Sequence, residues 1–188
     1  MSFGTVIRTA ILAVVLTCSA SAQESEAERL LRAGRVAEAL PVARVEAESA
    51  PDDLDAQERY IDALLTMGLI GVADEAYRGR LDAQGSANAW YLFGRVLPDA
   101  QLAEAAYKRA LEEDPNHARA LMGLGAVYRA TGNAPAAERY YTLALERDAT
   151  LSEAYSGLLQ IQLGTGRPDE ALATARAARA ANPSDPDA

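Results

Sequence analysis

Residues 118–151 carry the clearest structural signal in the chain and read ARALMGLGAVYRATGNAPAAERYYTLALERDATL. Near the middle, Gly132 is expected to end a first helix, because glycine readily takes the positive φ that lets a helix satisfy its last carbonyl groups. Small residues such as Gly125 and Ala137 let two helix axes approach closely, and the hole between them accepts a large side chain such as Leu121. The segment therefore predicts a helix, a short turn and a second helix packed on the first.

The same pattern returns along the chain with a period of 34 residues. The residues in register are Ala103, Ala137 and Ala171; Tyr107 and Tyr141; Gly34 and Gly68; Gly132 and Gly166. A single helix pair cannot bury its own apolar face, so neighbouring pairs must stack on one another. The period therefore predicts an array of helix pairs that covers most of the chain.

With these positions filled, residues 118–151 resemble the tetratricopeptide repeat, a helix–turn–helix unit of 34 residues. Residues 152–185 resemble it as well, residues 87–117 form a shorter unit with a tight turn at Pro98 and Asp99, and residues 54–86 form a weaker one. Residues 23–53 are expected to be a truncated first repeat or an N-terminal cap, and residues 186–188 a polar tail. The resemblance implies an all-α fold, a right-handed superhelical solenoid of antiparallel helix pairs with a concave face.

The composition agrees with a helical protein that does not bind nucleic acid. The 188 residues are 49% hydrophobic but only 6% aromatic, and alanine is abundant, which favours closely packed helices in one domain. The 27 acidic residues outnumber the 18 Lys and Arg, for a net charge of −9. Because nucleic-acid affinity comes largely from Lys and Arg contacts to phosphates, that ligand class is disfavoured.

Residues 1–22 have the pattern of an export signal. Arg8 supplies positive charge, residues 10–16 are apolar, and the small residues at 20–22 form a cleavage pattern. We expect cleavage near Ala22, release into the periplasm of a bacterium, and no stable membrane span afterwards. Cys18 leaves open a lipoprotein anchor, although Leu16 and Thr17 depart from the residues that usually precede a lipidated cysteine.

The sequence offers no catalytic set, so we expect no enzymatic activity, no cofactor and no metal site. The only histidine, His117, is expected to be a solvent-facing residue of a loop. Gly123 and Gly125 resemble the start of a dinucleotide-binding motif, but they follow no strand and lie inside a predicted helix. A lone histidine and a lone cysteine also exclude a metal site of several His or Cys ligands.

The family resemblance places partner-binding residues on the first helix of each repeat. On this chain those positions hold Asp55, Glu58, Asp62, Asn88, Tyr91, Arg95, Arg119, Met122, Arg129, Glu153, Ser156 and Gln160. The acidic N-terminal end gives way to three arginines, which we expect to pair with carboxylates of a partner. Glu58 and Asp62 stand where some family members carry Lys and Asn for a chaperone's C-terminal carboxylate, so that ligand is expected to be repelled.

These features predict a scaffold that binds a protein or peptide partner in its concave groove, within envelope, pilus or secretion assemblies of a bacterium. An alternative is a structural subunit that self-associates, as a homodimer or in a larger assembly, through its last helix. That helix, predicted at 171–181, is rich in alanine and is followed by no polar capping helix.

Overall fold

The structure is a computed structural model, and it describes residues 24–81 and 85–183. Within these ranges the chain forms ten α-helices and no strand. The helices are α2 (Glu26–Arg32), α3 (Val36–Ser49), α4 (Leu54–Thr66), α5 (Ile70–Leu81), α6 (Ala87–Val96), α7 (Ala100–Glu113), α8 (Ala118–Ala130), α9 (Ala134–Arg147), α10 (Ser152–Gly164) and α11 (Pro168–Ala181). The expectations for residues 1–22 and 186–188 lie outside the described ranges.

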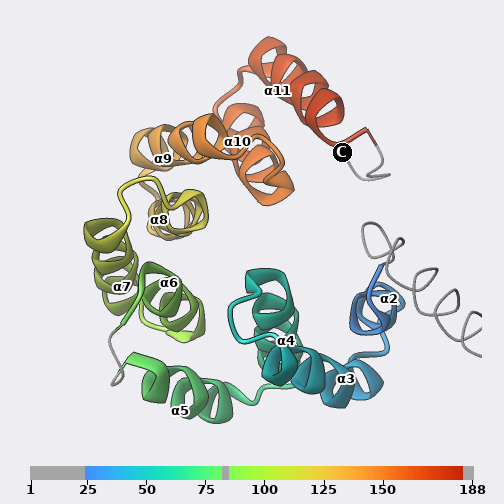
Figure 1. Ribbon diagram of the computed structural model, residues 1–188. Coiled ribbons are helices and arrows are strands. Elements are labelled where there is room, and N and C mark those ends of the chain that lie inside the picture. Colours follow the sequence, from blue (N-terminus) through green and yellow to red (C-terminus); the bar gives the residue numbers. More distant parts are fainter. Residues whose placement is uncertain (1–23, 82–84, 184–188) are drawn as a thin grey trace, which may run out of the picture.

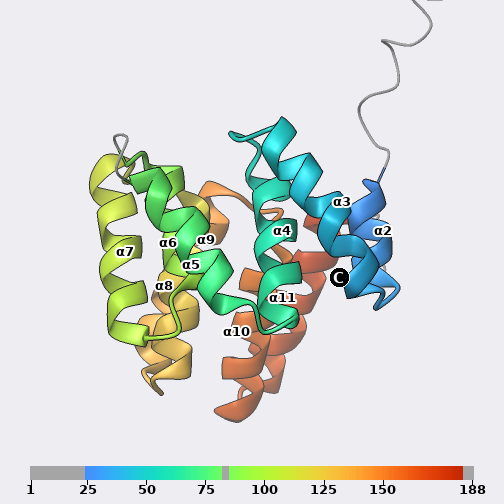
Figure 2. The ribbon, with the colours of Figure 1, turned by 90° about the horizontal axis from the view of Figure 1, so that it is seen from below.

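The helices stack as antiparallel pairs around an open curve. In Figure 1 the even-numbered helices α2, α4, α6, α8 and α10 line the inner side, and the odd-numbered helices form the outer side. Figure 2 shows neighbouring helices packed side by side with their axes roughly aligned. The prediction of an all-α solenoid of helix pairs is confirmed. The first helix of the array, α2, spans only seven residues.

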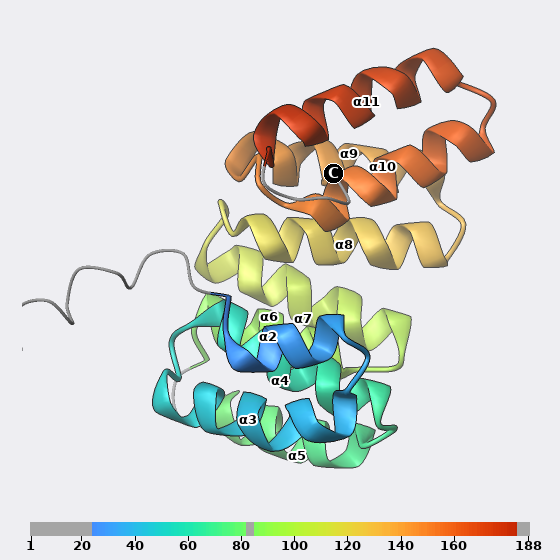
Figure 3. The same ribbon diagram turned by 90° about the vertical axis from the view of Figure 1, so that its right-hand side faces the viewer.

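The turns inside the pairs use glycine for a backbone conformation that other residues rarely adopt. Gly34, Gly68, Gly132 and Gly166 have φ between 70° and 79°. Each glycine follows the last residues of an inner helix, and the next residue's N–H returns to a carbonyl in that helix's last turn, as from Asn133 to Tyr128. These turns lie along one edge of the superhelix, as Figure 3 shows.

Two tyrosines of the outer helices lock consecutive inner helices together at paired glycines. A Cβ added at Gly94 of α6 or Gly123 of α8 would lie 2.6 Å from the Tyr107 ring. A Cβ at Gly125 of α8 or Gly157 of α10 would lie 2.7 Å or 2.4 Å from the Tyr141 ring. Each ring therefore occupies a slot that only two glycines leave open, which also gives Gly123 and Gly125 a packing role.

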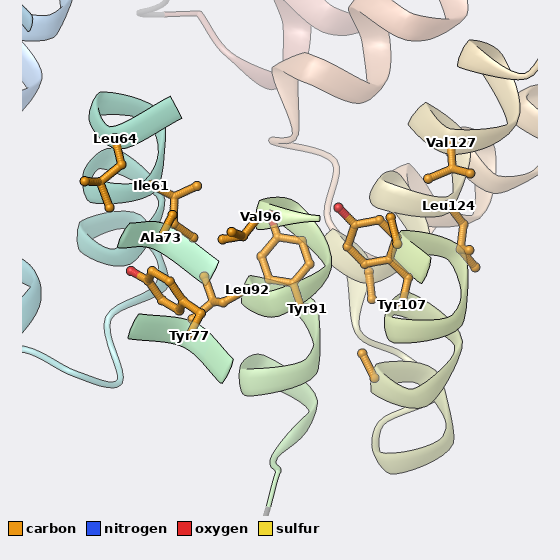
Figure 4. Close-up of a cluster of buried hydrophobic side chains, with 13 residues drawn as sticks. Ile61, Leu64, Ala73, Tyr77, Tyr91, Leu92, Val96, Tyr107, Leu124 and Val127 are labelled. Atoms are coloured by element: carbon orange, nitrogen blue, oxygen red, sulfur yellow. The ribbon is translucent and has the colours of Figure 1, made fainter. Parts of the chain in front are cut away.

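The main core runs through the middle pairs without a break. Figure 4 shows Ile61 and Leu64 of α4, Tyr91 of α6, Tyr107 of α7 and Leu124 of α8 in one buried cluster. A second cluster around Tyr141 joins α8, α9 and α10. Because each pair buries its apolar face against the next, the inner helices are held at fixed spacing along the concave side.

The expectation that His117 faces solvent is wrong. Its side chain is 7% exposed, and its Nδ1 accepts a hydrogen bond from the Ala120 N–H at 3.1 Å, so His117 caps the start of α8. Its Nε2 lies 2.9 Å from Asn88 Oδ1, and its ring packs against Tyr91 at 5.2 Å between centroids. Burial lowers the pKa of His117, which keeps the imidazole neutral and able to accept the capping bond.

None of the helices in the described ranges is long and apolar enough to cross a membrane.

Candidate partner-binding groove

The inner helices carry all twelve residues that the sequence places in the groove. Helix α4 holds the three acids, α6 holds the next three, α8 holds Arg119, Met122 and Arg129, and α10 holds the last three. Tyr91 is 1% exposed and Met122 is 7% exposed, so these two side chains belong to the packing and offer little surface to a partner. Asn88 is half-buried and is engaged by His117.

The acids of α4 and two of the arginines form one ion-pair network across three inner helices. Arg95 Nη2 of α6 pairs with Asp62 Oδ1 at 2.5 Å, and its Nη1 lies 3.8 Å from Glu58 Oε1. Arg119 Nη1 of α8 lies 2.9 Å from Glu58 Oε2, and its Nη2 pairs with Asp55. We name these five side chains the α4 network.

A buried tyrosine of α6 is hydrogen-bonded to the α4 network. The Tyr91 hydroxyl donates to the Glu58 carboxylate and accepts from Arg95 Nη1 at 3.4 Å. Burial raises the pKa of Tyr91 well above its usual 10, so the hydroxyl keeps the proton that it donates. Glu58 therefore contacts Arg95, Arg119 and Tyr91, and it is the common partner that holds the network together.

Burial and charge pairing act against each other within the α4 network. Burial alone would lower the pKa of Arg95, but the hydrogen bond to Tyr91 and the charges of Asp62 and Glu58 outweigh it and the pKa is raised. Burial likewise acts to lower the pKa of Arg119, and Glu58 and Asp55 reverse the shift. Both guanidinium groups stay charged, with only 17% and 21% of their side chains exposed.

The N-terminal half of the groove is thus close to electrically balanced by its own side chains. Three carboxylates face two guanidinium groups, which leaves one net negative charge in the α4 network. Two of the three arginines expected to meet a partner's carboxylates are therefore already paired. Releasing them would leave the largely buried carboxylate of Glu58 without a charged partner, which is costly.

Arg129 differs from the other two groove arginines. Its Nε donates to the Tyr141 hydroxyl at 3.3 Å and its Nη1 to Gln160 Oε1 at 3.0 Å. Its side chain is exposed, and no carboxylate pairs with it anywhere in residues 24–81 or 85–183. Two neutral oxygens therefore orient this guanidinium without cancelling its charge.

Arg129 lines an open cavity of about 320 Å³ between α8 and α10. The other lining residues are Ala126, Tyr141, Ser152, Glu153, Ser156, Gly157 and Gln160. The lining thus combines small residues and a tyrosine with polar side chains. Glu153, Ser156 and Gln160 are exposed there, so three predicted groove residues join Arg129 around one space.

A second cavity, also of about 320 Å³, lies between the α4 network and the turn from α9 to α10. Asp55, Glu58 and Arg119 line one side of it, and Asp148 and Thr150 line the other. The side chains of the described residues therefore leave the concave face open at two places.

Sequence reasoning did not single out Tyr141 as a groove residue or Asp148 and Thr150 as cavity-lining ones. The spacing of Tyr107 and Tyr141 signals a packing position, and only the structure shows that the Tyr141 hydroxyl reaches Arg129. Asp148 lies in the turn before α10, where the Thr150 hydroxyl and main-chain bonds help lower the pKa of its carboxyl. Among the described residues, no group of three or more His, Cys, Asp or Glu is arranged to hold a metal ion.

Comparison with known proteins agrees with this architecture. The sequence matches two family profiles, both described as tetratricopeptide repeat, one over residues 99–152 and the other over residues 129–188. Residues 99–188 therefore match the tetratricopeptide repeat, as the sequence pattern indicates. A search of curated proteins finds no match.

Solved structures of other repeat proteins share the fold. A tetratricopeptide repeat protein of Thermus thermophilus, TTC0263, superposes with a TM-score of 0.66 at 24% identity, over 85% of this chain and 89% of that one. The crystal structure of MamA gives 0.55 at 21% identity, over 86% and 96%. YrrB, described as having an unusual peptide-binding site, gives 0.52 at 18% identity, over 84% of both chains. At these identities the likeness shows the fold alone.

Proposed function

We propose that the protein is a non-enzymatic scaffold that binds a segment of a partner polypeptide in its concave groove. The observation that carries this proposal is the open cavity between α8 and α10, where Arg129 is exposed, oriented and unpaired with any carboxylate of the described chain. Concave surfaces of repeat arrays are a common place for extended ligands to bind. The peptide-binding site described for YrrB, which shares the fold, supports the same class of ligand.

The chemistry of the cavity favours a segment that carries a carboxylate. Arginine presents N–H groups in a fork that matches a carboxylate, and the Nη2 group of Arg129 makes no hydrogen bond within the described chain. The hydroxyl of Ser156 and the amide of Gln160 lie on the same cavity wall and add further hydrogen-bonding capacity. The α4 network offers no comparable site, because its two arginines are paired and its net charge is negative.

Quantitative affinity purification tests this proposal. Tagged wild type is compared with Arg129→Glu and with Arg139→Glu, which reverses the charge of an exposed arginine on the outer helix α9. The partner recovered with wild type is expected to fall at least tenfold with Arg129→Glu and to remain with Arg139→Glu. Equal recovery with all three would remove Arg129 from the binding site.

The setting proposed for this scaffold is the bacterial cell envelope. The support is the signal pattern of residues 1–22, with cleavage near Ala22 and a periplasmic mature chain, or an anchor at Cys18 as the alternative. The mass of the purified protein's N-terminal peptide distinguishes these cases. A start at Gln23 supports release, a lipid-modified Cys18 supports the anchor, and an intact Met1 contradicts export.

Self-association through the last helix is a second candidate. Leu172 of α11 is 51% exposed and Leu163 of α10 is 61% exposed, which gives this end of the array apolar surface. Ala178 is 5% exposed and faces the protein's interior, so it does not contribute to such an interface. Light scattering of wild type and Leu172→Glu tests this candidate, since only a dimer built on this surface would lose mass.

A further inference from the structure

The turn between α4 and α5 differs in chemistry from the equivalent turns of the first and last repeats. In the first and last repeats, the residues one and four places after the turn glycine form an ion pair. Arg35 pairs with Glu38 at 2.6 Å, and Arg167 pairs with Glu170 at 3.1 Å. The same two places after Gly68 hold Leu69 and Val72. The charged pair is thus replaced by an aliphatic pair at a position that faces solvent.

Four apolar side chains of this turn are exposed together. The exposed fractions are 45% for Met67, 37% for Leu69, 43% for Ile70 and 49% for Val72. They make up half of the eight large hydrophobic residues exposed within the described ranges, and they lie within six consecutive positions. We name these four residues the α4–α5 turn patch.

The patch continues into an apolar groove of about 310 Å³. Leu40, Pro41 and Arg44 of α3 form one wall, and Tyr60 and Leu64 of α4 with Leu69 and Val72 form the other. The one charged residue in its lining, Arg44, is paired with Glu48 at 3.8 Å. Burial of apolar surface, and not a specific ion pair, therefore provides the driving force for binding here.

The four exposed side chains are too small an area to hold a stable dimer by themselves. Four aliphatic side chains exposed to this extent present on the order of 300 Å², whereas a stable interface buries about 800 Å² on each partner. A patch of this size matches one face of a short helix, which contacts a groove through side chains one helical turn apart.

The net charge of the whole chain indicates which charge the polar face of that helix carries. With a net charge of −9, the protein attracts basic segments and is repelled by the anionic surface of a membrane. We infer that the α4–α5 turn patch and its adjoining groove bind a basic amphipathic helix of a partner polypeptide. Two aliphatic side chains of that helix enter the groove, at a surface separate from the concave cavity at Arg129.

The test uses a synthetic 14-residue amphipathic helix of leucine and lysine, labelled with a fluorophore, and measures anisotropy at about 0.15 M salt. A scrambled peptide of the same composition controls for charge alone. The double variant Leu69→Arg with Val72→Glu recreates the ion pair that the first and last repeats carry at these places, so its fold is expected to persist. Leu102→Arg removes a 58% exposed leucine on α7 and serves as the matched control.

The wild type and Leu102→Arg are expected to bind the helical peptide at least tenfold more tightly than the double variant does. Circular dichroism of the double variant confirms that its helices are intact. Equal binding of the scrambled peptide, equal binding by the double variant, or a wild-type Kd weaker than about 1 mM would overturn the inference. Wild-type dimerisation abolished by the double variant, or wild-type binding to phosphatidylcholine vesicles, would assign the patch to another occupant and overturn it too.

Discussion

Replacing Gly157 by alanine tests whether the tyrosine slots hold the inner helices together. The added Cβ would lie 2.4 Å from both Cε2 and Cζ of Tyr141 and 2.8 Å from its hydroxyl oxygen. Carbon atoms in contact normally lie about 3.5–4.0 Å apart, so the ring would have to move by roughly 1 Å. Tyr141 is 2% exposed and sits between α8 and α10, which leaves it little room to move.

The expected change in the free energy of unfolding follows from two opposing effects. Overpacking a close contact costs about 1–3 kcal/mol, while replacing glycine by alanine inside a helix gains about 1 kcal/mol. We expect Gly157→Ala to lower the free energy of unfolding by about 1 kcal/mol. The control is Gly79→Ala in α5, where nothing lies within 4 Å of the added Cβ and only the gain of up to about 1 kcal/mol applies. The two variants should therefore differ by about 2 kcal/mol.

Urea denaturation followed by circular dichroism measures both variants against the wild type. Tyr141→Leu provides a further check, because Gly157→Ala should cost less when the rigid ring is gone. Gly157→Ala should also weaken partner binding, since the Tyr141 hydroxyl accepts the hydrogen bond that orients Arg129. If Gly157→Ala were as stable as Gly79→Ala, the slot would not be tight and the packing argument would be refuted.

Three further predictions follow from single contacts. Arg95→Ala should lower the free energy of unfolding by about 1–3 kcal/mol, because Glu58 and Asp62 lose a partially buried partner. Arg44→Ala, which breaks an exposed pair, should lower it by less than about 0.5 kcal/mol, and urea denaturation measures both variants. Burial lowers the pKa of His117 from 6.5, so as the pH falls the unfolded chain takes up a proton at His117 before the folded chain does. The stability that the neutral imidazole contributes above about pH 6.5 is therefore lost as the pH falls below that value. Urea midpoints at about pH 7.5 and 5.5 should therefore differ less in His117→Asn, which keeps a capping side chain, than in wild type, and an equal difference would contradict the assignment. Gly68→Ala should cost about 1 kcal/mol in thermal denaturation because its φ is +72°, and an unchanged Tm would show that the turn relaxes.

The fold could be predicted from the sequence because the repeat places small and special residues at fixed positions. Gly132 and Gly166 end inner helices with positive φ, as expected, and the regular spacing of Tyr107 and Tyr141 marks the packing positions between pairs. These signals are local to each repeat, and they recur in successive repeats. Stacking then requires no information beyond the pattern itself.

The groove could be predicted only as a set of positions. The pairing of Arg119 with Asp55 joins residues 64 positions apart, across the intervening helix α6, and depends on how the superhelix curves. No pattern in the sequence specifies that curvature. The sequence therefore could not distinguish Arg119, which pairs with carboxylates, from Arg129, which pairs with none in the described chain. Likewise His117 follows a proline-containing loop, which suggests exposure, but Asn88 and Tyr91 of the preceding repeat enclose it.

The most direct test of the central claim is site-specific photo-cross-linking from the concave face. A photoreactive amino acid at Ser156, exposed in the cavity between α8 and α10, is compared with one at Thr142, exposed on the outer helix α9. Binding of a partner polypeptide in the groove predicts a covalent adduct from Ser156 that disappears with Arg129→Glu, and none from Thr142. Adducts from Thr142 alone, or from neither position, would contradict groove binding.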